Sequence, residues 1–480
     1  MENPSPTQEH TPQSRCRFAL ARCDITPPAN MYHRMWGAAK HERATGVHRP
    51  LCATVAVFVP LTGDEKQIVL ALDHCVMGRT ELEQFVNGIV AISGAKAAEI
   101  LVVFSHTHGA GLITLDRASL PGGDLIPSYL ESLGEKAGAL VKQCLSSLKP
   151  ANIVYGRGRC SLATQRDFWD AQRQQFVCGH HPGAPADDTL IVARVSDDTH
   201  EIIATVVNYA CHPTTLAWEN TLISPDYIGA MRELVERETG APCLFLQGAC
   251  GELGPREGFV GDTAVADRNG RELGYAALST LTALPRAGTK FVYAGPVVSG
   301  ATLGAWKHEA LDASEAEALS TWRLTRWPEV LPYRAGQPTL EETQAELEQF
   351  QAGEAAARAA GDEARAADCR AMVERRNRML HRIKQLPSGA SYPLQVVLWR
   401  IGEAFWLGVQ GESYSLLQTE LRRRFPEKII VLASITADWG ASYLPPRELY
   451  DTGIYQESIA VVAAGSLEQL IESIAQRIGL

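Results

Sequence analysis

The sequence predicts an α/β protein in which mixed β-sheets are flanked by helices and one helical arm is inserted. Short apolar runs separated by Gly and Pro recur from Arg17 to about residue 330 and predict strands. A stretch rich in Ala, Glu, Arg and Gln follows at 339–386 and predicts one or two long exposed helices. Strands are expected again at 392–399 and 405–409, and an amphipathic helix is expected at 467–478.

The predicted parts of the chain are a disordered tail at 1–15, one α/β domain at 16–335 and 388–480, and a helical insertion at 336–387. Gly353 and Gly361 are candidate breaks in the insertion. Its Arg and Glu residues recur at helical spacing, which favours a solvated face. The functional alternatives are a lid over a site and a dimerisation arm, which would make the protein a homo-oligomer.

Composition and charge exclude several classes of protein. The 480 residues are 45% hydrophobic and 21% charged, unlike a fibrous or wholly disordered chain. A net charge of −10 opposes binding to nucleic acid. The sequence has no apolar run of about 18 residues and no signal-peptide pattern, so we expect a cytoplasmic protein without stable membrane insertion. The 11 scattered cysteines predict reduced thiols.

Five apolar strands run directly into polar or Gly-rich turns. They are EILVVF before SHTHGAG, EIIATVVNYA before CHPTT, APCLFL before QGACGELGP, AFWLGV before QGESYS, and KIIVLA before SITADWGASY. Ligands of open α/β sheets bind beyond the carboxyl ends of strands, so side chains placed there converge. The convergent set is predicted to be His106, His108, His212, Glu412 and Tyr443.

The histidines in this set suggest a metal. His106 and His108 are two residues apart, so on an extended segment their rings point the same way and can share a metal or a substrate. Histidines that only hydrogen-bond the backbone are the alternative. With His212 and Glu412 the set becomes imidazoles plus one carboxylate, which is typical of a hydrolytic zinc site. We expect one zinc ion per chain, although iron and manganese accept the same ligands.

At these same residues the sequence resembles the catalytic domain of the neutral/alkaline (non-lysosomal) ceramidases, zinc-dependent amidases that cleave the N-acyl bond of ceramide. The resemblance is collinear and spans most of the chain outside the tail and the arm. Its motifs are CDITPP, WGAA, TGVH, LALDH, FSHTHGAG, NYACHPTT, SPDYIGAM, LQGACGELGP, GVQGES and SYLPPRELYDTGIYQES.

The resemblance implies roles for single residues. The zinc ligands it implies are His106, His212, Glu412 and Tyr443. Tyr450 and Tyr455 compete with Tyr443, because the alignment needs a gap there. The residues that it implies for handling the substrate carbonyl are His108, Arg166 in TQRDF, and Tyr455. The alternatives are that Arg166 is only a surface salt-bridge partner and that Tyr455 is a core aromatic.

The sequence also departs from the family pattern. Ceramidases carry a serine in a G-D-x-S-P motif, whereas this chain has Gly254 at the serine's place in GELGP. Cys250, four residues earlier, is predicted to be a packed thiol. A metal-activated water is therefore the expected nucleophile, with His108 as general base or acid. The turn QGACGELG could stabilise an oxyanion through its N–H groups, and a purely structural tight turn is the alternative.

These observations predict a metal-dependent hydrolase that cleaves an amide, or less favourably an ester, in a small or lipid-like acylated substrate. The sequence shows neither the export signal nor the immunoglobulin-like domain of secreted ceramidases, so membrane ceramide is not the expected substrate. A non-catalytic metal-binding sensor or pseudoenzyme is the second hypothesis, because Gly254 lacks the serine hydroxyl. A metal-assisted lyase is the third, since a polarised carbonyl also favours loss of the adjacent proton.

Asp73 directly follows the apolar run IVLAL and has two interpretations. It could orient a ligand histidine by accepting a hydrogen bond from its second ring nitrogen. It could equally cap the turn that follows.

Overall fold

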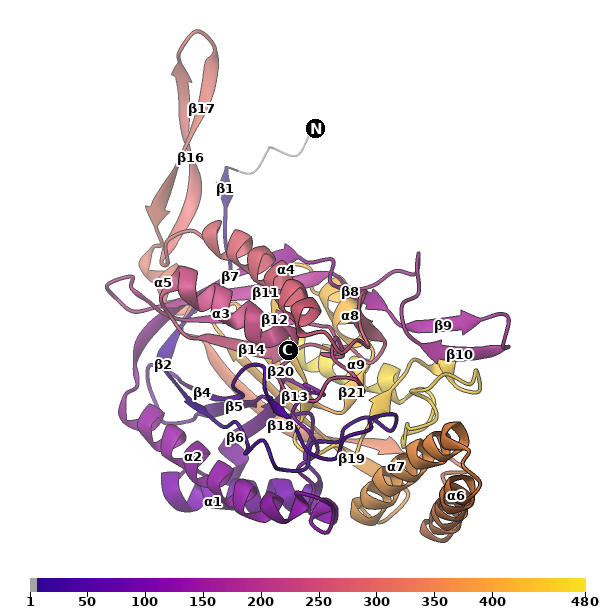
Figure 1. Cartoon of the computed structure of the whole chain (residues 1–480). Coiled ribbons are helices and arrows are strands. Elements are labelled where there is room, and N and C mark those ends of the chain that lie inside the picture. Colours follow the sequence, from indigo (N-terminus) through magenta and orange to yellow (C-terminus); the bar gives the residue numbers. More distant parts are fainter. Residues whose placement is uncertain (1–6) are drawn as a thin grey trace.

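A twelve-stranded mixed β-sheet forms the centre of the protein in a computed structural model that describes residues 7–480 (Figure 1). In spatial order its strands are β14 (Cys243–Gln247), β12 (Ile202–Tyr209), β11 (Thr189–Ser196), β7 (Lys149–Arg159), β2 (Gln13–Asp24), β4 (Cys52–Val59), β5 (Gln67–Leu72), β6 (Ile100–Phe104), β22 (Ile429–Thr436), β20 (Ala404–Gln410), β19 (Ser391–Ile401) and β18 (Trp322–Pro332). The pairs β12–β14, β5–β6 and β20–β22 are parallel and the other neighbours are antiparallel. The predicted α/β class with a mixed sheet is confirmed.

Helices cover the outer faces of this sheet. Their bounds are α1 (Arg79–Ser93), α2 (Ile126–Ser146), α3 (Tyr227–Thr239), α4 (Thr263–Thr282), α5 (Ala313–Ala318), α6 (Leu340–Ala359), α7 (Glu363–Gln385), α8 (Leu416–Arg424) and α9 (Ser466–Ile478). Buried side chains of α1 to α4 pack on the half of the sheet that runs from β14 to β6. Those of α8 and α9 pack on the half formed by β18, β19, β20 and β22. The amphipathic C-terminal helix expected at 467–478 is α9.

The two halves of the sheet face each other across an aromatic core. Successive residues of a strand point to opposite faces, so each strand contributes one row of side chains outward and one row inward. Phe58 of β4 and Tyr155 of β7 meet Trp399 and Trp406 of the other half in this inner layer. The ring centroids of Phe58 and Trp406 are 4.9 Å apart, and Trp406 Nε1 donates to the Tyr155 hydroxyl at 3.2 Å. The layers are therefore helix, sheet, sheet and helix.

The disordered tail predicted at 1–15 is only partly consistent with the structure. Residues 1–6 lie outside the described part of the chain. Gln8–Glu9 form strand β1, which pairs with β16 (Thr289–Val298), and β2 begins at Gln13. Gln13 and Ser14 are each 1% exposed. The prediction is wrong for residues 8–9 and 13–15 because partners far along the chain satisfy their polar groups, as when Gln13 Nε2 donates to Thr289 O at 2.9 Å.

The helical insertion consists of α6 and α7, which pack on each other. The chain turns at Gly361, whose φ of +71° favours glycine, whereas Gly353 lies inside α6. The second helix is also fixed to the body of the protein. Glu374 of α7 is 1% exposed and pairs with the buried Arg117 at 3.0 Å. The insertion is therefore anchored through α7, and a dimerisation role stays a prediction.

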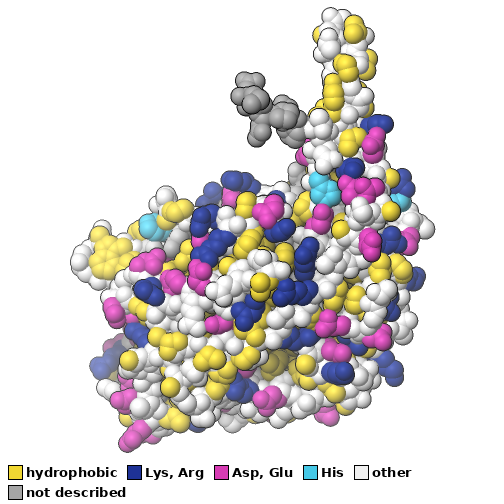
Figure 2. Space-filling view, turned by 180° about the vertical axis from the view of Figure 1, so that it is seen from behind, with side chains coloured by type: hydrophobic (Ala, Val, Ile, Leu, Met, Phe, Trp, Pro, Cys, Tyr) yellow, Lys and Arg dark blue, Asp and Glu magenta, His cyan; other side chains and the backbone are white. Residues whose placement is uncertain are grey.

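A β-hairpin of β16 and β17 (Thr302–Ala310) projects from the body beside the start of the chain (Figure 1). Hydrophobic side chains gather toward its tip (Figure 2), and Val298 is 83% exposed. Short strand pairs complete the fold: β3 (Gly46–Val47) with β13 (Leu222–Ile223), β8 (Ala163–Gln165) with β15 (Leu253–Pro255), β9 (Asp167–Asp170) with β10 (Gln175–Cys178), and β21 (Glu412–Ser413) with β23 (Tyr443–Leu444). Across residues 7–480 no helix has the length and apolarity needed to cross a bilayer.

The burial of Trp406 in the aromatic layer predicts that this side chain contributes strongly to stability. Trp406 is 1% exposed, so Trp406→Ala removes a large buried side chain and leaves a cavity between the two halves of the sheet. We expect the free energy of unfolding to fall by about 3–5 kcal/mol in urea denaturation. Trp306→Ala, at a 40% exposed position on the hairpin, is the control and is expected to change it by less than about 1 kcal/mol. Equal losses in the two variants would contradict this view of the core.

Candidate metal centre

The side chains predicted to converge do meet, and each comes from the end of a core strand. His106 and His108 follow β6, and His212 follows β12. Glu412 lies in β21 directly after β20, and Tyr443 lies in β23, which the chain reaches after β22. Strands β21 and β23 pair in parallel with Glu412 opposite Tyr443. The site therefore lies where strands from both halves of the sheet end.

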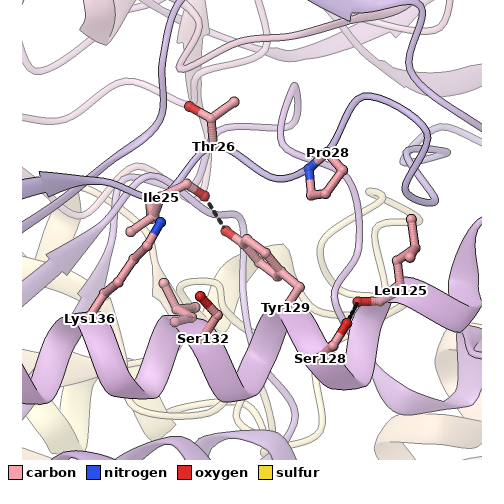
Figure 3. Close-up of a pocket in the computed structure, with 9 residues that line it drawn as sticks. Ile25, Thr26, Pro28, Leu125, Ser128, Tyr129, Ser132 and Lys136 are labelled. Atoms are coloured by element: carbon pink, nitrogen blue, oxygen red, sulfur yellow. Dashed lines mark hydrogen bonds between the residues drawn. The ribbon is translucent and has the colours of Figure 1, made fainter.

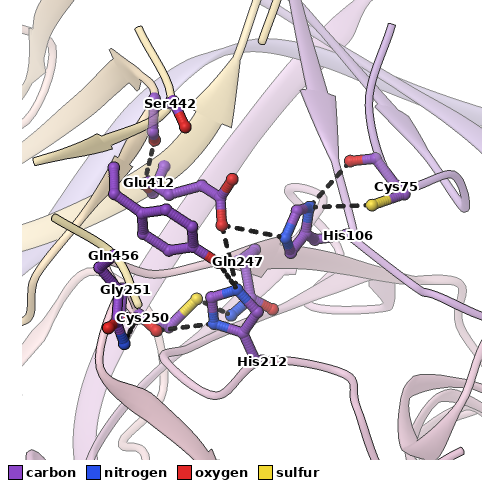
Figure 4. A network of polar contacts seen from close by, with 12 residues as sticks. Cys75, His106, His212, Gln247, Cys250, Gly251, Glu412, Ser442 and Gln456 are labelled. Carbon is purple, nitrogen blue, oxygen red and sulfur yellow. Dashed lines mark hydrogen bonds and ion pairs between the residues drawn. The ribbon is translucent and has the colours of Figure 1, made fainter. Parts of the chain in front are cut away.

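Three of these side chains share one point in space (Figure 4). Nε2 of His106 lies 3.3 Å from Oε2 of Glu412, and Nε2 of His212 lies 3.1 Å from the same oxygen. All three ligand atoms lie within 4.8 Å of one another. His106 is 3% exposed and His212 is fully buried, so water has little access to the lone pairs that face one another here.

The other ring nitrogens fix the tautomers of both histidines. His106 Nδ1 donates to the Cys75 carbonyl at 2.9 Å, and His212 Nδ1 donates to the Cys250 carbonyl at 2.7 Å. A carbonyl oxygen only accepts, so each Nδ1 carries the hydrogen and each neutral ring presents an Nε2 lone pair to Glu412. Two lone pairs and a carboxylate facing one another repel unless a cation or a proton lies between them. The donor set fits a divalent metal such as zinc.

The pKa values of these groups also reflect the close approach of the two histidines to Glu412. Burial alone would lower the pKa of His106, but the neighbouring Cys75 and Glu412 outweigh it and raise that pKa well above its usual value. Burial would raise the pKa of Glu412, but the two histidines hold it well below its usual value. Burial and the Arg166 guanidinium lower the pKa of His212 to about 3. The site as a whole therefore favours one positive charge next to Glu412.

Tyr443 borders the same point. Its hydroxyl lies 3.3 Å from His212 Nε2 and accepts a hydrogen bond from Arg166 Nη2 at 3.0 Å. Tyr450, one alternative from the sequence, instead donates to the Val462 carbonyl at 2.9 Å. Of the tyrosines considered, Tyr443 is the one whose hydroxyl lies next to a ligand histidine.

A second cluster of candidate ligands, Cys75, His106 and His108, lies in the same region. His106 Nδ1 is 3.5 Å from Cys75 Sγ, but this nitrogen already donates to the Cys75 carbonyl. It cannot offer a lone pair while it carries that hydrogen. The geometry therefore favours His212 and Glu412 as the partners of His106 and leaves His108 outside the ligand set.

His108 lies beside the centre with a nitrogen available for chemistry. Its ring centroid is 5.0 Å from that of His106 and 5.0 Å from that of Trp36. Its Nε2 is buried and has no hydrogen-bond partner among the described residues. Burial, together with the positive charge that His106 and His212 can carry, lowers the pKa of His108 well below its usual value. The ring is therefore neutral at physiological pH and can accept a proton.

For both Arg166 and Tyr455, the structure disagrees with the purely structural interpretation considered from the sequence. Arg166 is 4% exposed and donates to the Gly251 carbonyl at 2.7 Å, so it is not a surface salt-bridge partner. Tyr455 is 44% exposed and lines the cavity, with its ring 6.0 Å from that of Tyr443, so it is not a core aromatic. Both residues lie where a substrate carbonyl could reach them.

Four N–H groups of the turn after β14 are not free to form the oxyanion site considered from the sequence. The backbone N–H groups of Gly248, Ala249, Gly251 and Leu253 already donate to acceptors of the protein. The structural interpretation of this turn is therefore favoured. Cys250 is fully buried, as predicted for a packed thiol, and burial raises its pKa far above the usual range.

Gly254 faces the site without a side chain. A Cβ built there would lie 3.6 Å from Arg166 Cδ and 3.8 Å from Thr214 Oγ1, which are ordinary contact distances. Space for a Cβ is thus present, although the residue is glycine.

Asp73 has neither of the roles considered for it. Its carboxylate forms a two-point ion pair with Arg232 at 2.8 and 2.9 Å and accepts the Cys52 N–H at 2.9 Å. The pair joins the end of β5 to α3, and the Nδ1 atoms of the two ligand histidines donate to backbone carbonyls instead. Asp73 therefore fixes the strand end from which Cys75 reaches His106.

The centre opens into a cavity of about 440 Å³. Its lining includes His106, His108, Arg166, Glu412, Tyr443 and Tyr455, together with aromatic side chains and one face of α7. The sequence analysis considered a lid over a site as an alternative for the insertion, and α7 does line the cavity. A second cavity of about 300 Å³ lies beside α2, where Tyr129 donates to the Ile25 carbonyl at 2.6 Å (Figure 3), and holds none of the predicted site residues.

Backbone strain gathers around the centre. His106 has a φ of +67°, and Ile435, Ala437 and Ser442 near Glu412 and Tyr443 have φ values of +57°, +59° and +53°. Such conformations cost non-glycine residues roughly 1–3 kcal/mol each and often occur at functional sites.

No protein-family model and no curated protein matches the sequence. Solved structures do match the fold. A structure titled as a ceramidase complexed with C2 aligns with a TM-score of 0.64 and 15% identity, over 98% of this chain and 76% of that chain. Neutral ceramidase from Pseudomonas aeruginosa aligns with a TM-score of 0.63 and 16% identity, over 97% and 74% respectively. The protein therefore has the fold of the neutral ceramidases.

Proposed function

We propose that the protein is a metal-dependent hydrolase, with zinc as the metal, that cleaves an amide bond in an acylated substrate. The observation that carries the proposal is the meeting of His106 Nε2, His212 Nε2 and Glu412 Oε2 with both Nδ1 atoms held by carbonyls. The fold shared with ceramidases, which are amidases, supports amide hydrolysis over other metal chemistry. Ester cleavage uses the same groups and is the weaker alternative.

His106, His212, Glu412 and Tyr443 would hold the metal. When bound, zinc would supply Lewis-acid polarisation of the substrate carbonyl and would lower the pKa of a water molecule. Tyr443 suits the fourth position because Arg166 Nη2 donates to its hydroxyl oxygen and so sets the direction in which the hydroxyl points.

His108 is the proposed general base and acid. The ring is neutral and its Nε2 has no hydrogen-bond partner within residues 7–480, so it can take the proton of the attacking water. The same nitrogen can then give that proton to the amine that leaves. The Trp36 ring packs against the imidazole and limits its rotation.

Tyr455 is the proposed donor to the substrate carbonyl. It lines the cavity next to Tyr443, and burial of its hydroxyl end raises the pKa of Tyr455 above the usual value, so the phenol keeps its proton. A neutral phenol can stabilise the negative charge that develops on the carbonyl oxygen.

The missing hydroxyl at Gly254 favours one alternative, a non-catalytic metal-binding sensor. Masses of the products separate the possibilities, because hydrolysis adds water, a lyase reaction does not, and a sensor forms no product. Gly254→Ser should fold, since the added Cβ has ordinary contacts. If water is the nucleophile, we expect its turnover to stay within about threefold of the wild type in a steady-state assay. Turnover that appears only in the serine variant would support the sensor.

Substitutions of the histidines should separate metal binding from turnover. His106→Ala and His212→Ala each remove a ligand, so we expect both to lose bound zinc, as measured by plasma mass spectrometry, and activity with it. His108→Ala should keep one zinc per chain and lose about 10²- to 10⁴-fold in turnover. Zinc retained by the His106/His212 double variant would show that the ligands are elsewhere.

Zinc binding should release a proton. The raised pKa of His106 means that the metal-free protein holds a proton there at pH 7, whereas zinc needs the neutral ring. We expect about one proton to be released per zinc at pH 7. Release should disappear as the pH rises through the raised pKa of His106. Titration calorimetry in two buffers with different ionisation heats measures this number. Equal heats in both buffers at pH 7 would mean that His106 is already neutral.

A further inference from the structure

The cavity in front of the centre is basic, although the protein is acidic. The whole chain has a net charge of −10. The cavity lining, however, includes the guanidinium groups of Arg166, Arg375, Arg378 and Arg382 against the carboxylates of Glu374 and Glu412. A bound divalent metal would add to the positive charge. The charge of the cavity lining is thus opposite in sign to the net charge of the whole protein. A positively charged cavity favours an anionic ligand.

Three of these arginines come from one face of α7. Arg375, Arg378 and Arg382 are spaced three and four residues apart, so they lie above one another on the helix. Arg378 is compensated, because its Nε donates to Glu374 at 3.2 Å. Glu374 also pairs with Arg117, so one buried carboxylate serves two guanidinium groups.

Arg382 and Arg375 have no such carboxylate partner among the described residues. Arg382 Nη1 donates to Ser442 Oγ at 3.1 Å, and Arg375 Nη2 donates to Ser458 Oγ at 2.9 Å. The Nε of each is buried without a hydrogen-bond partner among the described residues, and neither forms an ion pair with a described carboxylate. Of the two groups it is the Arg382 guanidinium that is desolvated, and a desolvated guanidinium is rarely left without an anion. Burial lowers the pKa of Arg382 to about 10, so the group is still cationic at neutral pH.

Arg382 also lies close to the reacting centre. Its partner Ser442 directly precedes Tyr443, and the Ser442 carbonyl accepts the Glu412 N–H at 2.7 Å. An anion held by Arg382 would therefore lie near the proposed ligands Glu412 and Tyr443. The anionic group and the bond to be cleaved must be near each other in the substrate.

Another part of the cavity lining is apolar. Trp36, Trp218 and Phe259 pack on one another there, with ring centroids 5.7 Å apart for Trp36 and Phe259 and 6.4 Å apart for Trp218 and Phe259. Trp36 also contacts the ring of His108. This aromatic wall suits a hydrophobic acyl or aryl group.

From these contacts we infer that the substrate is an anionic N-acyl compound, with a carboxylate or phosphate on the amine side close to the amide. Arg382 and Arg375 bind the anion, and the aromatic wall binds the acyl group. This rests on the proposed amide hydrolysis. The C–N bond breaks, the water oxygen forms a bond to the acyl carbon, and the water proton moves to the nitrogen. The products are a hydrophobic carboxylic acid and an amine that carries the anion.

A matched substrate series tests the inference on the full-length, zinc-loaded protein. The probes are N-octanoylglycine, N-octanoylethanolamine phosphate and the neutral N-octanoylethanolamine. We expect kcat/KM for at least one anionic amide to exceed that of the neutral amide by about tenfold or more, since charge-assisted hydrogen bonds are lost with the neutral probe. The two anionic probes distinguish a carboxylate site from a phosphate site.

Variants of α7 assign the effect to named side chains. Arg382→Met should lower the ratio of kcat/KM for the anionic amide to kcat/KM for the neutral amide by about tenfold. Arg382→Lys should restore part of it, because the charge returns without the two-point geometry. Arg365→Gln removes one charge from an exposed position on the same helix and should leave the preference unchanged.

Each failure has a separate meaning. A neutral amide that is hydrolysed as well as both anionic amides, or an anionic preference that survives in Arg382→Met and Arg375→Met, would overturn the inference and leave the proposed hydrolase intact. If no amide is hydrolysed, calorimetric binding of N-octanoylglycine to wild type and Arg382→Met decides. Tighter binding to the wild type by about tenfold would sustain the anion site, and equal binding would reject it.

Discussion

The carboxylate of Glu412 is the group on which the site depends. One of its oxygens faces the Nε2 lone pairs of His106 and His212, whose Nδ1 atoms are held by backbone carbonyls. Because the backbone fixes both tautomers, the two rings cannot turn a hydrogen toward the carboxylate without breaking a buried hydrogen bond. The arrangement is thus repulsive unless a proton on His106 or a metal cation lies between these groups, and a metal that binds must displace that proton.

The fold makes this arrangement possible because the two halves of the sheet end at the same place. The histidines come from β6 and β12 in one half, and Glu412 comes from the end of β20 in the other. The aromatic layer around Phe58 and Trp406 fixes the separation of the halves. A shift between the two halves would move Glu412 relative to the rings of His106 and His212. The geometry of the site therefore depends on the packing of the core.

The sequence predicts the strand ends well and the cavity walls poorly. H-T-H, C-H-P and G-E-S each follow an apolar run, and strand ends converge by a general property of sheets, so His106, His212 and Glu412 could be found without a structure. The choice of Tyr443 over Tyr450 needed the pairing of β21 with β23, which local sequence does not encode. The strands at 8–9 and 13–15 were missed for the same reason, since their partners lie hundreds of residues away.

The insertion is the part of the chain where composition misleads most. A helix with many Arg and Glu residues is typical of a solvated face, yet Glu374 is buried against Arg117, and Arg378 shares that carboxylate from the cavity side. This shared pair fixes the rotation of α7 about its axis, and with it the direction in which the face of Arg375 and Arg382 points. The charges that look like solubilising residues in the sequence are therefore the means by which the insertion sets the polarity of the cavity. Strand ends supply the proposed metal ligands, whereas α7 supplies guanidinium groups that form no ion pair with a described carboxylate. The proposed bond cleavage and the proposed choice of substrate therefore depend on different parts of the chain.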